Sequence, residues 1–534
     1  DRRRGGARCL NPWTQAMTTL DTPVAGDVLP PFATIAERVH EHALRDPRHP
    51  ALADDTRAID YATLDAWMDR IAAALQRDGL RRGEAVAICA GTSVAYAAVF
   101  LGALRAGAAV APIAPSVTRT QFGAMLRDAG ARLCFVDAAA VELLPQGPDA
   151  PRCVRFDDLA PGVAFDDWLA PPGAQPQPVV IGPAEPFNII YSSGTTGTPK
   201  GIVQPHGMRW AHVLRGASYG YGPGTTTLLA TPLYSNTTLV VFFPTLAYGG
   251  AVRLMAKFDA RRYLEIAQAL RVTHTMLVPV QYQRLMALPD FDAFDLRSFQ
   301  AKFCTSAPFP AALKADVLKR WPGGLIEFYG LTEGGGTCIL EAHAHPDKLH
   351  TVGRPAQGSD IRLIDEHGRE LTIAAVAAGV AGEVVGASPG MMTGYHGRPE
   401  LTREAEWFDA MGKRFIRTGD IGRFDADGFL ILFDRRKDMV ISGGFNIYPS
   451  DLEAELRRHP AVEDAAVVGV PSAQWGETPV AFVVRRAGHH DEPEALRAWL
   501  NGRVGKTQRL SALHLIDELP RSAIGKVLKR ELRD

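Results

Sequence analysis

Apolar residues recur along the chain at two different spacings. Leu64, Trp67, Ile71 and Leu75 follow the spacing of one helix face, so residues 63–77 are predicted to form an amphipathic helix. Short apolar runs between glycine and polar residues predict strands, with helical stretches between them. Up to residue 304 these strands are Ala85–Ala90, Ala109–Ile113, Arg132–Val136, Phe187–Ile190, Leu228–Thr231, Ala251–Met255, Thr275–Pro279 and Lys302–Cys304. Their alternation with helices predicts an α/β fold with a largely parallel sheet.

The pattern changes toward the C-terminus. Ile361–Ile364 and Gly382–Gly386 are short strand-like runs between turns, which is typical of a small β region. After residue 438 the predicted elements are helices Ser450–His459 and Glu492–Leu500 and strands Ala465–Val470 and Val480–Val484. We therefore predict an α/β protein of three parts: a tail (1–29), a large N-terminal domain of α/β layers plus the small β region (30–436), and a small mobile α+β lid domain (437–534).

Length and composition agree with a multidomain cytoplasmic protein. A chain of 534 residues exceeds the usual size of one core. The net charge of −1 gives no basic field for nucleic acid or an anionic membrane. Six cysteines without Cys-x-x-Cys spacing argue against a disulfide framework or a zinc site, and no apolar stretch is long enough to span a bilayer. Residues 1–16 are basic and precede Met17, so we expect upstream or added sequence, or a disordered tail.

One glycine- and hydroxyl-rich stretch stands out from this alternation. Residues 191–201 read Tyr-Ser-Ser-Gly-Thr-Thr-Gly-Thr-Pro-Lys-Gly and follow a predicted strand. Glycines let backbone N–H groups turn inward, hydroxyls add donors and Lys200 adds charge, so the stretch suits an anion. By composition alone, a flexible surface loop is an equally good interpretation. It is not the ordinary P-loop, because Pro199 precedes Lys200 and Gly201 follows it.

Four more motifs follow this stretch in order. They are Tyr329-Gly330-Leu331-Thr332-Glu333, Arg417-Thr418-Gly419-Asp420, residues 434–438 (Asp-Arg-Arg-Lys-Asp) with 442–449 (Ser-Gly-Gly-Phe-Asn-Ile-Tyr-Pro), and residues 520–526 (Pro-Arg-Ser-Ala-Ile-Gly-Lys). Together the five motifs make residues 30–534 resemble the adenylate-forming superfamily: acyl- and aryl-CoA ligases, luciferases and peptide-synthetase adenylation domains. The chain is most similar to the AMP-forming acyl-CoA ligases. Each motif alone is weak, whereas five in order are specific.

The resemblance implies a reaction in two halves. A carboxylate attacks the α-phosphorus of ATP, which gives an acyl-adenylate and pyrophosphate, and a thiol then displaces AMP to give a thioester. Such chemistry needs charge neutralisation and positioning more than a protein nucleophile. The cofactors that the resemblance implies are therefore ATP, Mg2+ and coenzyme A.

The resemblance also assigns residues to the nucleotide. Those expected to hold the β- and γ-phosphates are Ser192, Ser193, Gly194, Thr195, Thr196, Gly197, Thr198 and Lys200. Thr332 would bond the α-phosphate and Glu333 would ligand Mg2+, which usually takes one or two carboxylates. Asp420 would accept hydrogen bonds from the ribose hydroxyls, and Arg435 would add a second ribose or phosphate contact. The adenine and acyl pocket would include Ser306, Ala307 and Pro308, and Tyr329 and Gly330 would also belong to the cofactor-binding residues.

Each of these residues also has a simpler interpretation. From composition alone, Glu333 is a solvated turn carboxylate, Asp420 belongs to an ordinary Gly-Asp turn and Arg435 is a surface arginine. Lys526, near the chain end, is on average a solvated charge. In the resembled family the corresponding lysine reaches from the lid into the active site and stabilises the transition state.

The second half-reaction implicates the start of the lid. In the family the lid rotates after adenylation, and Lys437 occupies the pivot position, which must absorb a large φ/ψ change. Gly443 and Gly444 would then line the tunnel for the pantetheine arm, because residues without side chains let a thin chain pass. A tight turn between strands is the alternative.

The acid site departs from the family pattern. Many acyl-CoA ligases carry an aromatic or histidine gate where this chain has Tyr234, Ser235 and Asn236. Amino-acid-activating relatives use an Asp nearby, and none occurs between Thr231 and Lys257, which disfavours an α-amino acid because its ammonium would be uncompensated. Residues expected to shape the acyl pocket are Val280, Gly334 and Gly335. The run of three glycines, 334–336, favours an aryl or medium acyl acid.

We therefore predict an ATP- and Mg2+-dependent carboxylate–CoA ligase. The nearest alternative keeps the adenylation and passes the acyl group to a carrier-protein thiol, an amine or another nucleophile. A non-catalytic scaffold with an inherited fold is the other alternative, and the intact motif residues argue against it. An acyl carrier protein and a second copy of the chain are the protein partners left open.

Overall fold

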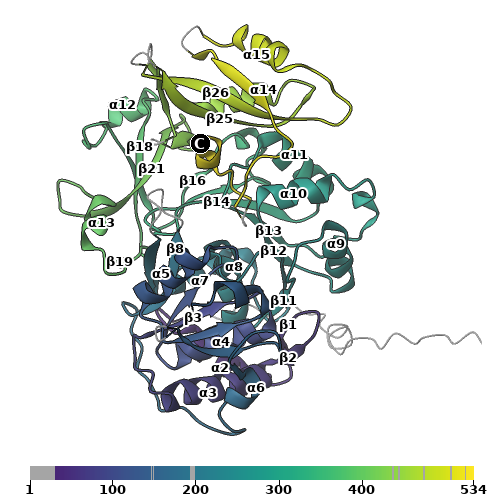
Figure 1. Cartoon of the computed structure of the whole chain (residues 1–534), viewed down its shortest axis with the longest axis vertical. Coiled ribbons are helices and arrows are strands. Elements are labelled where there is room, and N and C mark those ends of the chain that lie inside the picture. The colour runs from purple at the N-terminus through teal and green to yellow at the C-terminus, as the bar shows by residue number, and fades with distance from the viewer. Residues whose placement is uncertain are drawn as a thin grey trace, which may run out of the picture.

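The computed structural model of the protein describes residues 30–145, 147, 150–192, 199–435, 438–442, 445–472, 476–505, 508–522 and 525–533. Among these residues, three sheets belong to a large N-terminal part and a fourth to a small C-terminal domain. Figure 1 shows the C-terminal domain at one end of the long axis, opposite the first helices. The predicted α/β fold is confirmed.

An eight-stranded sheet has the order β19-β9-β8-β4-β3-β5-β6-β7. Its strands are parallel from β8 to β7, whereas the β8–β9 and β9–β19 pairs are antiparallel. The strands are β3 (Ala85–Cys89), β4 (Ala109–Pro112), β5 (Leu133–Val136), β6 (Arg152–Arg155), β7 (Val163–Ala164), β8 (Pro186–Ser192), β9 (Lys200–Pro205) and β19 (Gly394–Tyr395).

A nine-stranded sheet has the order β16-β15-β14-β13-β12-β10-β11-β1-β2. Strands β14 to β1 in this order are parallel, and β2, β15 and β16 pair antiparallel with their neighbours. The strands are β1 (Pro50–Ala53), β2 (Ala58–Asp60), β10 (Thr226–Leu229), β11 (Ala251–Leu254), β12 (His274–Leu277), β13 (Ala301–Cys304), β14 (Gly324–Tyr329), β15 (Cys338–Glu341) and β16 (Arg354–Pro355). Because parallel strands share a carboxyl edge, the segments that follow β10, β12, β13 and β14 emerge together, where ligands bind in open α/β sheets.

Two smaller sheets follow in the chain. The first is antiparallel: β17 (Asp360–Ile364), β18 (Gly382–Ala387), β20 (Glu406–Phe408), β21 (Arg414–Phe424) and β22 (Leu430–Arg435). The second forms the C-terminal domain: β23 (Val440–Ser442), β24 (Phe445–Ile447), β25 (Val462–Ser472), β26 (Gly476–Arg485) and β27 (Ala512–Leu515). Strands β25 and β26 extend beyond the predicted runs because they pair with each other along most of their length.

Half of the α-helices in the described ranges begin at a residue whose side chain caps them. The helix predicted over 63–77 starts at Tyr61, because the Asp60 carboxylate accepts a hydrogen bond from the Thr63 N–H at 2.8 Å. None of the helices in the described ranges combines the length and apolar content needed to cross a bilayer. They are α2 (Ile35–Arg45), α3 (Tyr61–Arg77), α4 (Val94–Arg105), α5 (Arg119–Ala129), α6 (Phe165–Trp168), α7 (His206–Arg215), α8 (Asn236–Ala247), α9 (Ala260–Ala269), α10 (Pro279–Met286), α11 (Ala311–Arg320), α12 (Ile373–Ala377), α13 (Pro399–Glu404), α14 (Pro449–Leu456) and α15 (Pro493–Asn501).

Helix α8 continues through Pro244. A proline inside a helix removes one hydrogen bond and costs about 3 kcal/mol. Burial offsets this cost: Phe243 is 1% exposed, and its ring lies 5.5 Å from that of Phe100 and 4.9 Å from that of Phe187. Burying one such side chain contributes roughly 1.5–3 kcal/mol. The core therefore fixes α8, and with it the residues at its N-terminus.

Candidate active site

The glycine- and hydroxyl-rich stretch joins two antiparallel strands. Strand β8 ends at Ser192, β9 begins at Lys200, and these two residues are register partners. The predicted phosphate residues Ser193, Gly194, Thr195, Thr196, Gly197 and Thr198 lie outside the described residues. The sequence pattern did not predict β9.

Lys200, Tyr395 and Glu333 come together beside this hairpin. The Nζ of Lys200 lies 5.4 Å from the centre of the Tyr395 ring, a cation–π distance. The Tyr395 hydroxyl donates to Oε1 of Glu333 at 2.8 Å. Burial, together with the Glu333 charge, raises the pKa of Tyr395, so its hydroxyl stays protonated and remains a donor. Two of the predicted phosphate and metal residues are thus joined by a tyrosine.

Glu333 suits a magnesium ion in its chemistry. Mg2+ prefers oxygen ligands and usually takes few of them from the protein. Within the described ranges, no group of three or more His, Cys, Asp or Glu side chains forms a metal cluster. A single carboxylate beside the predicted triphosphate site fits an ion that would take its other ligands from phosphate and water.

Tyr329 and Asp420 form a second buried pair. The Tyr329 hydroxyl donates to Oδ2 of Asp420 at 2.8 Å, and Asp420 is 8% exposed. Burial, with the Asp420 charge, raises the pKa of Tyr329 well above its usual value. Arg435 is the register partner of Asp420 across β21 and β22, so the two predicted ribose residues are neighbours in one sheet.

The loop after β13 meets the N-terminus of α8. Ser306 has a φ of +83°, a left-handed conformation that is strained for a residue other than glycine. Its hydroxyl is hydrogen-bonded to that of Thr237, and Ser235 caps the same helix through the Thr237 N–H. Tyr234 precedes this cap and is half-buried. The helix that begins at the predicted gate residues therefore contacts, through Thr237, the predicted adenine loop, which continues through Ala307 and Pro308.

The triple glycine packs against the chain's own backbone. A Cβ on Gly334 would lie 1.9 Å from the carbonyl oxygen of Gly390, and one on Gly336 would lie 1.8 Å from Cδ1 of Ile361. Gly334 and Gly335 also have positive φ values of 73° and 97°. These contacts and dihedrals account for the glycines in this turn, which follows Gly330 and the Thr332–Glu333 pair. The three glycines therefore do not by themselves show how much space the pocket offers to an acyl group.

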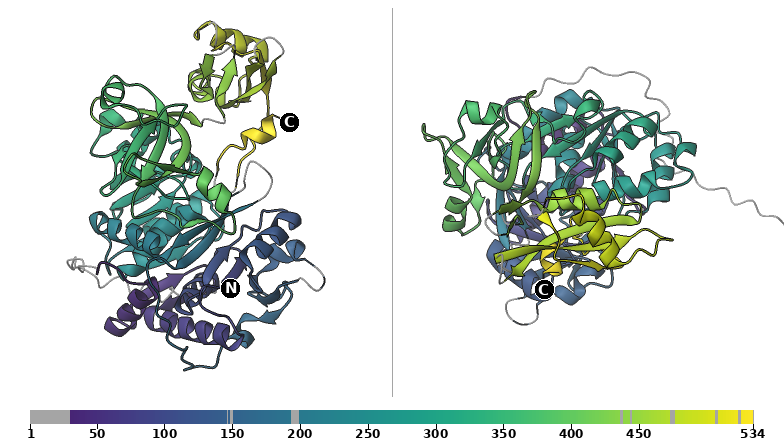
Figure 2. Two further views of the ribbon diagram at one scale, coloured as in Figure 1. Left: turned by 90° about the vertical axis from the view of Figure 1, so that its left-hand side faces the viewer. Right: turned by 90° about the horizontal axis from the view of Figure 1, so that it is seen from above.

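The turn that carries Lys526 reaches the large domain. A Cβ on Gly525 would lie 2.7 Å from Cγ1 of Val280, the second residue of α10. Hydrogen bonds hold this turn, because the Ser522 N–H donates to the Lys526 carbonyl at 2.8 Å and the Lys526 N–H donates to the Ser522 hydroxyl at 3.2 Å. The left view of Figure 2 shows the last residues running back toward the large part of the molecule. The predicted hinge and tunnel residues Lys437, Gly443 and Gly444 lie outside the described residues.

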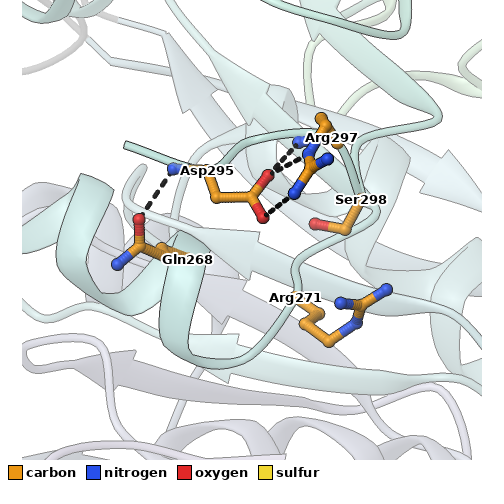
Figure 3. Close-up of a pocket in the computed structure, with 5 residues that line it drawn as sticks. All are labelled: Gln268, Arg271, Asp295, Arg297 and Ser298. Atoms are coloured by element: carbon orange, nitrogen blue, oxygen red, sulfur yellow. Dashed lines mark hydrogen bonds and ion pairs between the residues drawn. The ribbon is translucent and has the colours of Figure 1, made fainter. Parts of the chain in front are cut away.

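A surface hollow elsewhere has no comparable chemistry. It has a volume of about 370 Å³ and is lined by Gln268, Arg271, Asp295, Arg297 and Ser298, which Figure 3 labels. The carboxylate of Asp295 pairs with the Arg297 guanidinium at N–O distances of 2.8 Å. The backbone N–H of Asp295 donates to Oε1 of Gln268 at 2.7 Å. Asp295 is thus already bonded by two of its neighbours, and none of the five residues belongs to the five motifs.

The class of protein follows from this arrangement and from two family models. The AMP-binding enzyme model matches residues 39–396, and the AMP-binding enzyme C-terminal domain model matches residues 451–526. The chain belongs to the AMP-binding enzyme family, and it is an adenylate-forming ligase. The resemblance found in the sequence is thereby confirmed.

Individual relatives cover nearly the whole chain. The chain is 32% identical to the fatty acid–[acyl-carrier-protein] ligase ScoC of Streptomyces coeruleorubidus, over 95% of this chain and 97% of that protein. It is 33% identical to a feruloyl-CoA synthase of an Amycolatopsis species, over 92% and 96%. The structure of the amide bond synthetase McbA from Marinactinospora thermotolerans superposes with a TM-score of 0.82 at 28% identity, covering 93% of this chain and 98% of that one.

Four residues near the site were not predicted. Tyr395 belongs to a family-like Gly-Tyr phrase in the sequence, which was a usable signal. Thr237, Gln204 and Arg209 carried no such signal, because their importance lies in contacts with distant segments: Gln204 donates to the Thr332 carbonyl at 2.6 Å, 128 positions away.

Proposed function

We propose that this adenylate-forming ligase uses ATP and Mg2+ to convert a carboxylic acid, of aryl or medium acyl type, to an acyl-adenylate, and then transfers the acyl group to coenzyme A. The proposed domains are an N-terminal domain (30–436) and a lid (437–534). One observation carries the proposal: Lys200 with Glu333, Tyr329 with Asp420, and the Lys526 turn gather near one edge of the nine-stranded sheet.

In the first half-reaction the chain's task is to neutralise and position negative charge. Lys200 would bind the outer phosphates, and Glu333, oriented by Tyr395, would hold Mg2+, which supplies further charge neutralisation. Asp420, oriented by Tyr329, would accept hydrogen bonds from the ribose. Lys526 would contact the oxygens that gain charge as the carboxylate attacks the α-phosphorus and pyrophosphate leaves.

The second half-reaction needs a different face of the lid. Lys437 is the proposed pivot, and Gly443 and Gly444 the proposed tunnel for the pantetheine arm. Rotation would withdraw Lys526 and admit the thiol, which attacks the acyl carbonyl carbon while the bond to AMP breaks. A contact that such a rotation has to break is the one between Gly525 and Val280.

The absence of acidic residues from positions 231–257 supports an acid without an α-ammonium group. The feruloyl-CoA and fatty-acid ligases among the relatives act on an aryl and an acyl acid respectively, in line with the proposed substrate range.

The acceptor has two alternatives, each favoured by one relative. ScoC is a carrier-protein ligase, and McbA is an amide bond synthetase. The test is ATP–pyrophosphate exchange with a panel of acids, followed by mass analysis of products formed with coenzyme A, an acyl carrier protein or amines. Exchange without any acyl-CoA product would refute the thioester step, and no exchange with any acid would refute the proposed function.

A further inference from the structure

Arg209 is a buried cation without an anionic partner in the described part of the chain. It lies on α7 and is 1% exposed. Its Nε and Nη2 donate to Oδ1 of Asn188 at 3.2 and 3.1 Å, and Nη2 also donates to Oε1 of Gln204. Nη1 has no hydrogen-bond partner among the described residues. Burial lowers the pKa of Arg209 to about 9, which leaves it charged at neutral pH.

A buried guanidinium without a counter-charge does little to stabilise a fold. A buried charge without a counter-charge costs free energy, and apolar residues of similar volume are often as good or better for the fold. The guanidinium does, however, fix the direction of every hydrogen bond that it makes, because it has donors and no acceptor.

The donors of Arg209 determine how the side-chain amide of Gln204 is oriented. Since Oε1 of Gln204 accepts from Arg209, its amide N–H groups must point to the other side. There Nε2 donates to the Thr332 carbonyl at 2.6 Å and to Oδ1 of Asn236 at 3.3 Å. Gln204 is fully buried, so it has no room to exchange these partners with water.

The hydrogen bond from Gln204 determines the orientation of the Asn236 amide in the same way. Its Oδ1 is turned toward Gln204, so its two N–H groups point away from the network. Asn236 is half-buried and opens α8, and in the described ranges no hydrogen bond engages its Nδ2. Next to Asn236, the hydroxyls of Thr237 and Ser306 are hydrogen-bonded to each other. The N–H donors of Asn236 therefore lie between the turn that carries Thr332 and the loop after β13.

We propose that Arg209 and Gln204 are positioning residues that hold the Asn236 amide as a hydrogen-bond donor toward the carboxylate of the acid substrate. The inference rests on the proposed function and names the recognised group: an anionic oxygen acceptor. The N-terminus of α8 and the charge of Arg209 add positive potential at the same place, where two anions, carboxylate and α-phosphate, have to approach. An ammonium group bound beside Asn236 would meet only hydrogen-bond donors and would find no acceptor.

The test inverts the polarity of the network at nearly constant volume. Gln204→Glu gives Arg209 a carboxylate partner, but it offers both Asn236 and the Thr332 carbonyl an acceptor instead of a donor. Asn236 should turn over and present its oxygen to the acid, and the Thr332 turn should lose a hydrogen bond. We expect the acid KM in ATP–pyrophosphate exchange to rise at least tenfold and the ATP KM to rise less.

Three further variants complete the design. Asn236→Asp keeps the hydrogen bond between Gln204 and the Thr332 carbonyl, so it should raise the acid KM at least as much while the ATP KM stays within about twofold.

Arg209→Met should also raise the acid KM, because Gln204 loses the donor that fixes its direction. Arg38→Met is its matched control, because Arg38 is also a buried arginine (5% exposed), but it pairs with Glu41 and bonds the Ala247 carbonyl at 3.1 Å. The control should lower the melting temperature and leave the acid KM unchanged.

The outcomes separate the two proposals. Exchange by the wild type together with an unchanged acid KM in Gln204→Glu and Asn236→Asp would overturn the positioning role alone. An equal rise of the acid and ATP KM values would also overturn it, because it would show general damage to the site. No exchange by the wild type with any acid would overturn the proposed function, and the positioning role with it.

Discussion

The pair formed by Tyr329 and Asp420 allows the ribose assignment to be tested at the level of single atoms. In Asp420→Asn one carboxylate oxygen becomes an amide nitrogen at nearly constant volume. The Tyr329 hydroxyl can accept as well as donate, so the 2.8 Å contact survives and the fold should be kept. The variant therefore removes mainly the negative charge offered to the ribose hydroxyls.

The size of the effect follows from the two kinds of hydrogen bond. A bond to a charged acceptor contributes roughly 1.5–3 kcal/mol and a neutral bond roughly 0.5–1.5 kcal/mol, so the variant should lose about 1–1.5 kcal/mol. That difference corresponds to a rise of roughly 5–15-fold in the KM for ATP.

The assay is a double-mutant cycle between protein and nucleotide. Exchange rates are measured for wild type and Asp420→Asn with ATP, 2′-deoxy-ATP and 3′-deoxy-ATP. If Asp420 bonds a ribose hydroxyl, the wild type should discriminate against at least one deoxynucleotide, and the variant should discriminate much less. Equal discrimination by both proteins, which means additive penalties, would refute the assignment.

Three further predictions concern the lid and the core. Lys526→Ala should nearly abolish adenylate formation and spare thioester formation from a supplied acyl-adenylate; equal loss of both rates would argue against its assigned role. Gly444→Trp should spare adenylate formation and nearly abolish thioester formation; normal thioester formation in single-turnover assays would argue against the proposed tunnel at this glycine. Burial lowers the pKa of His274 to about 4, so its contribution to stability is present above pH 6.5 and is lost as the pH falls toward 4. Roughly 2 kcal/mol should disappear between pH 7 and 5, and His274→Phe should flatten the fall in melting temperature over that range; an unchanged slope would contradict this cause.

The sequence could predict the sheets and the five motifs because both depend on local signals. Runs such as Ala85–Cys89 and Leu228–Leu229 are buried on both faces of parallel strands, and this burial makes them continuously apolar. The order of the motifs was enough to identify the family. The roles of the individual motif residues remain predictions.

What the sequence did not reveal are pairings across long separations. Glu333 and Tyr395 are 62 positions apart, and Arg38 reaches a carbonyl 209 positions away. The triple glycine illustrates the same point, because the atoms for which its missing side chains make room include Ile361, which lies in another sheet. At the gate, the direction of the Asn236 amide depends on two residues of the β9–α7 segment that belong to no motif.

The register of β19 on β9 has a consequence for how this family of enzymes can change in length. Tyr395 is the partner of Ile202, two residues beyond Lys200, while Lys200 itself faces Ser192 across the hairpin. An insertion between positions 192 and 200 leaves both strand pairings intact, so it would disturb the proposed phosphate contacts without disturbing the sheet. A deletion of one residue within β9 would instead turn every following side chain to the opposite face and separate Lys200 from Tyr395 and Glu333. The tolerance of the sheet to insertions and deletions should therefore fall sharply at Lys200.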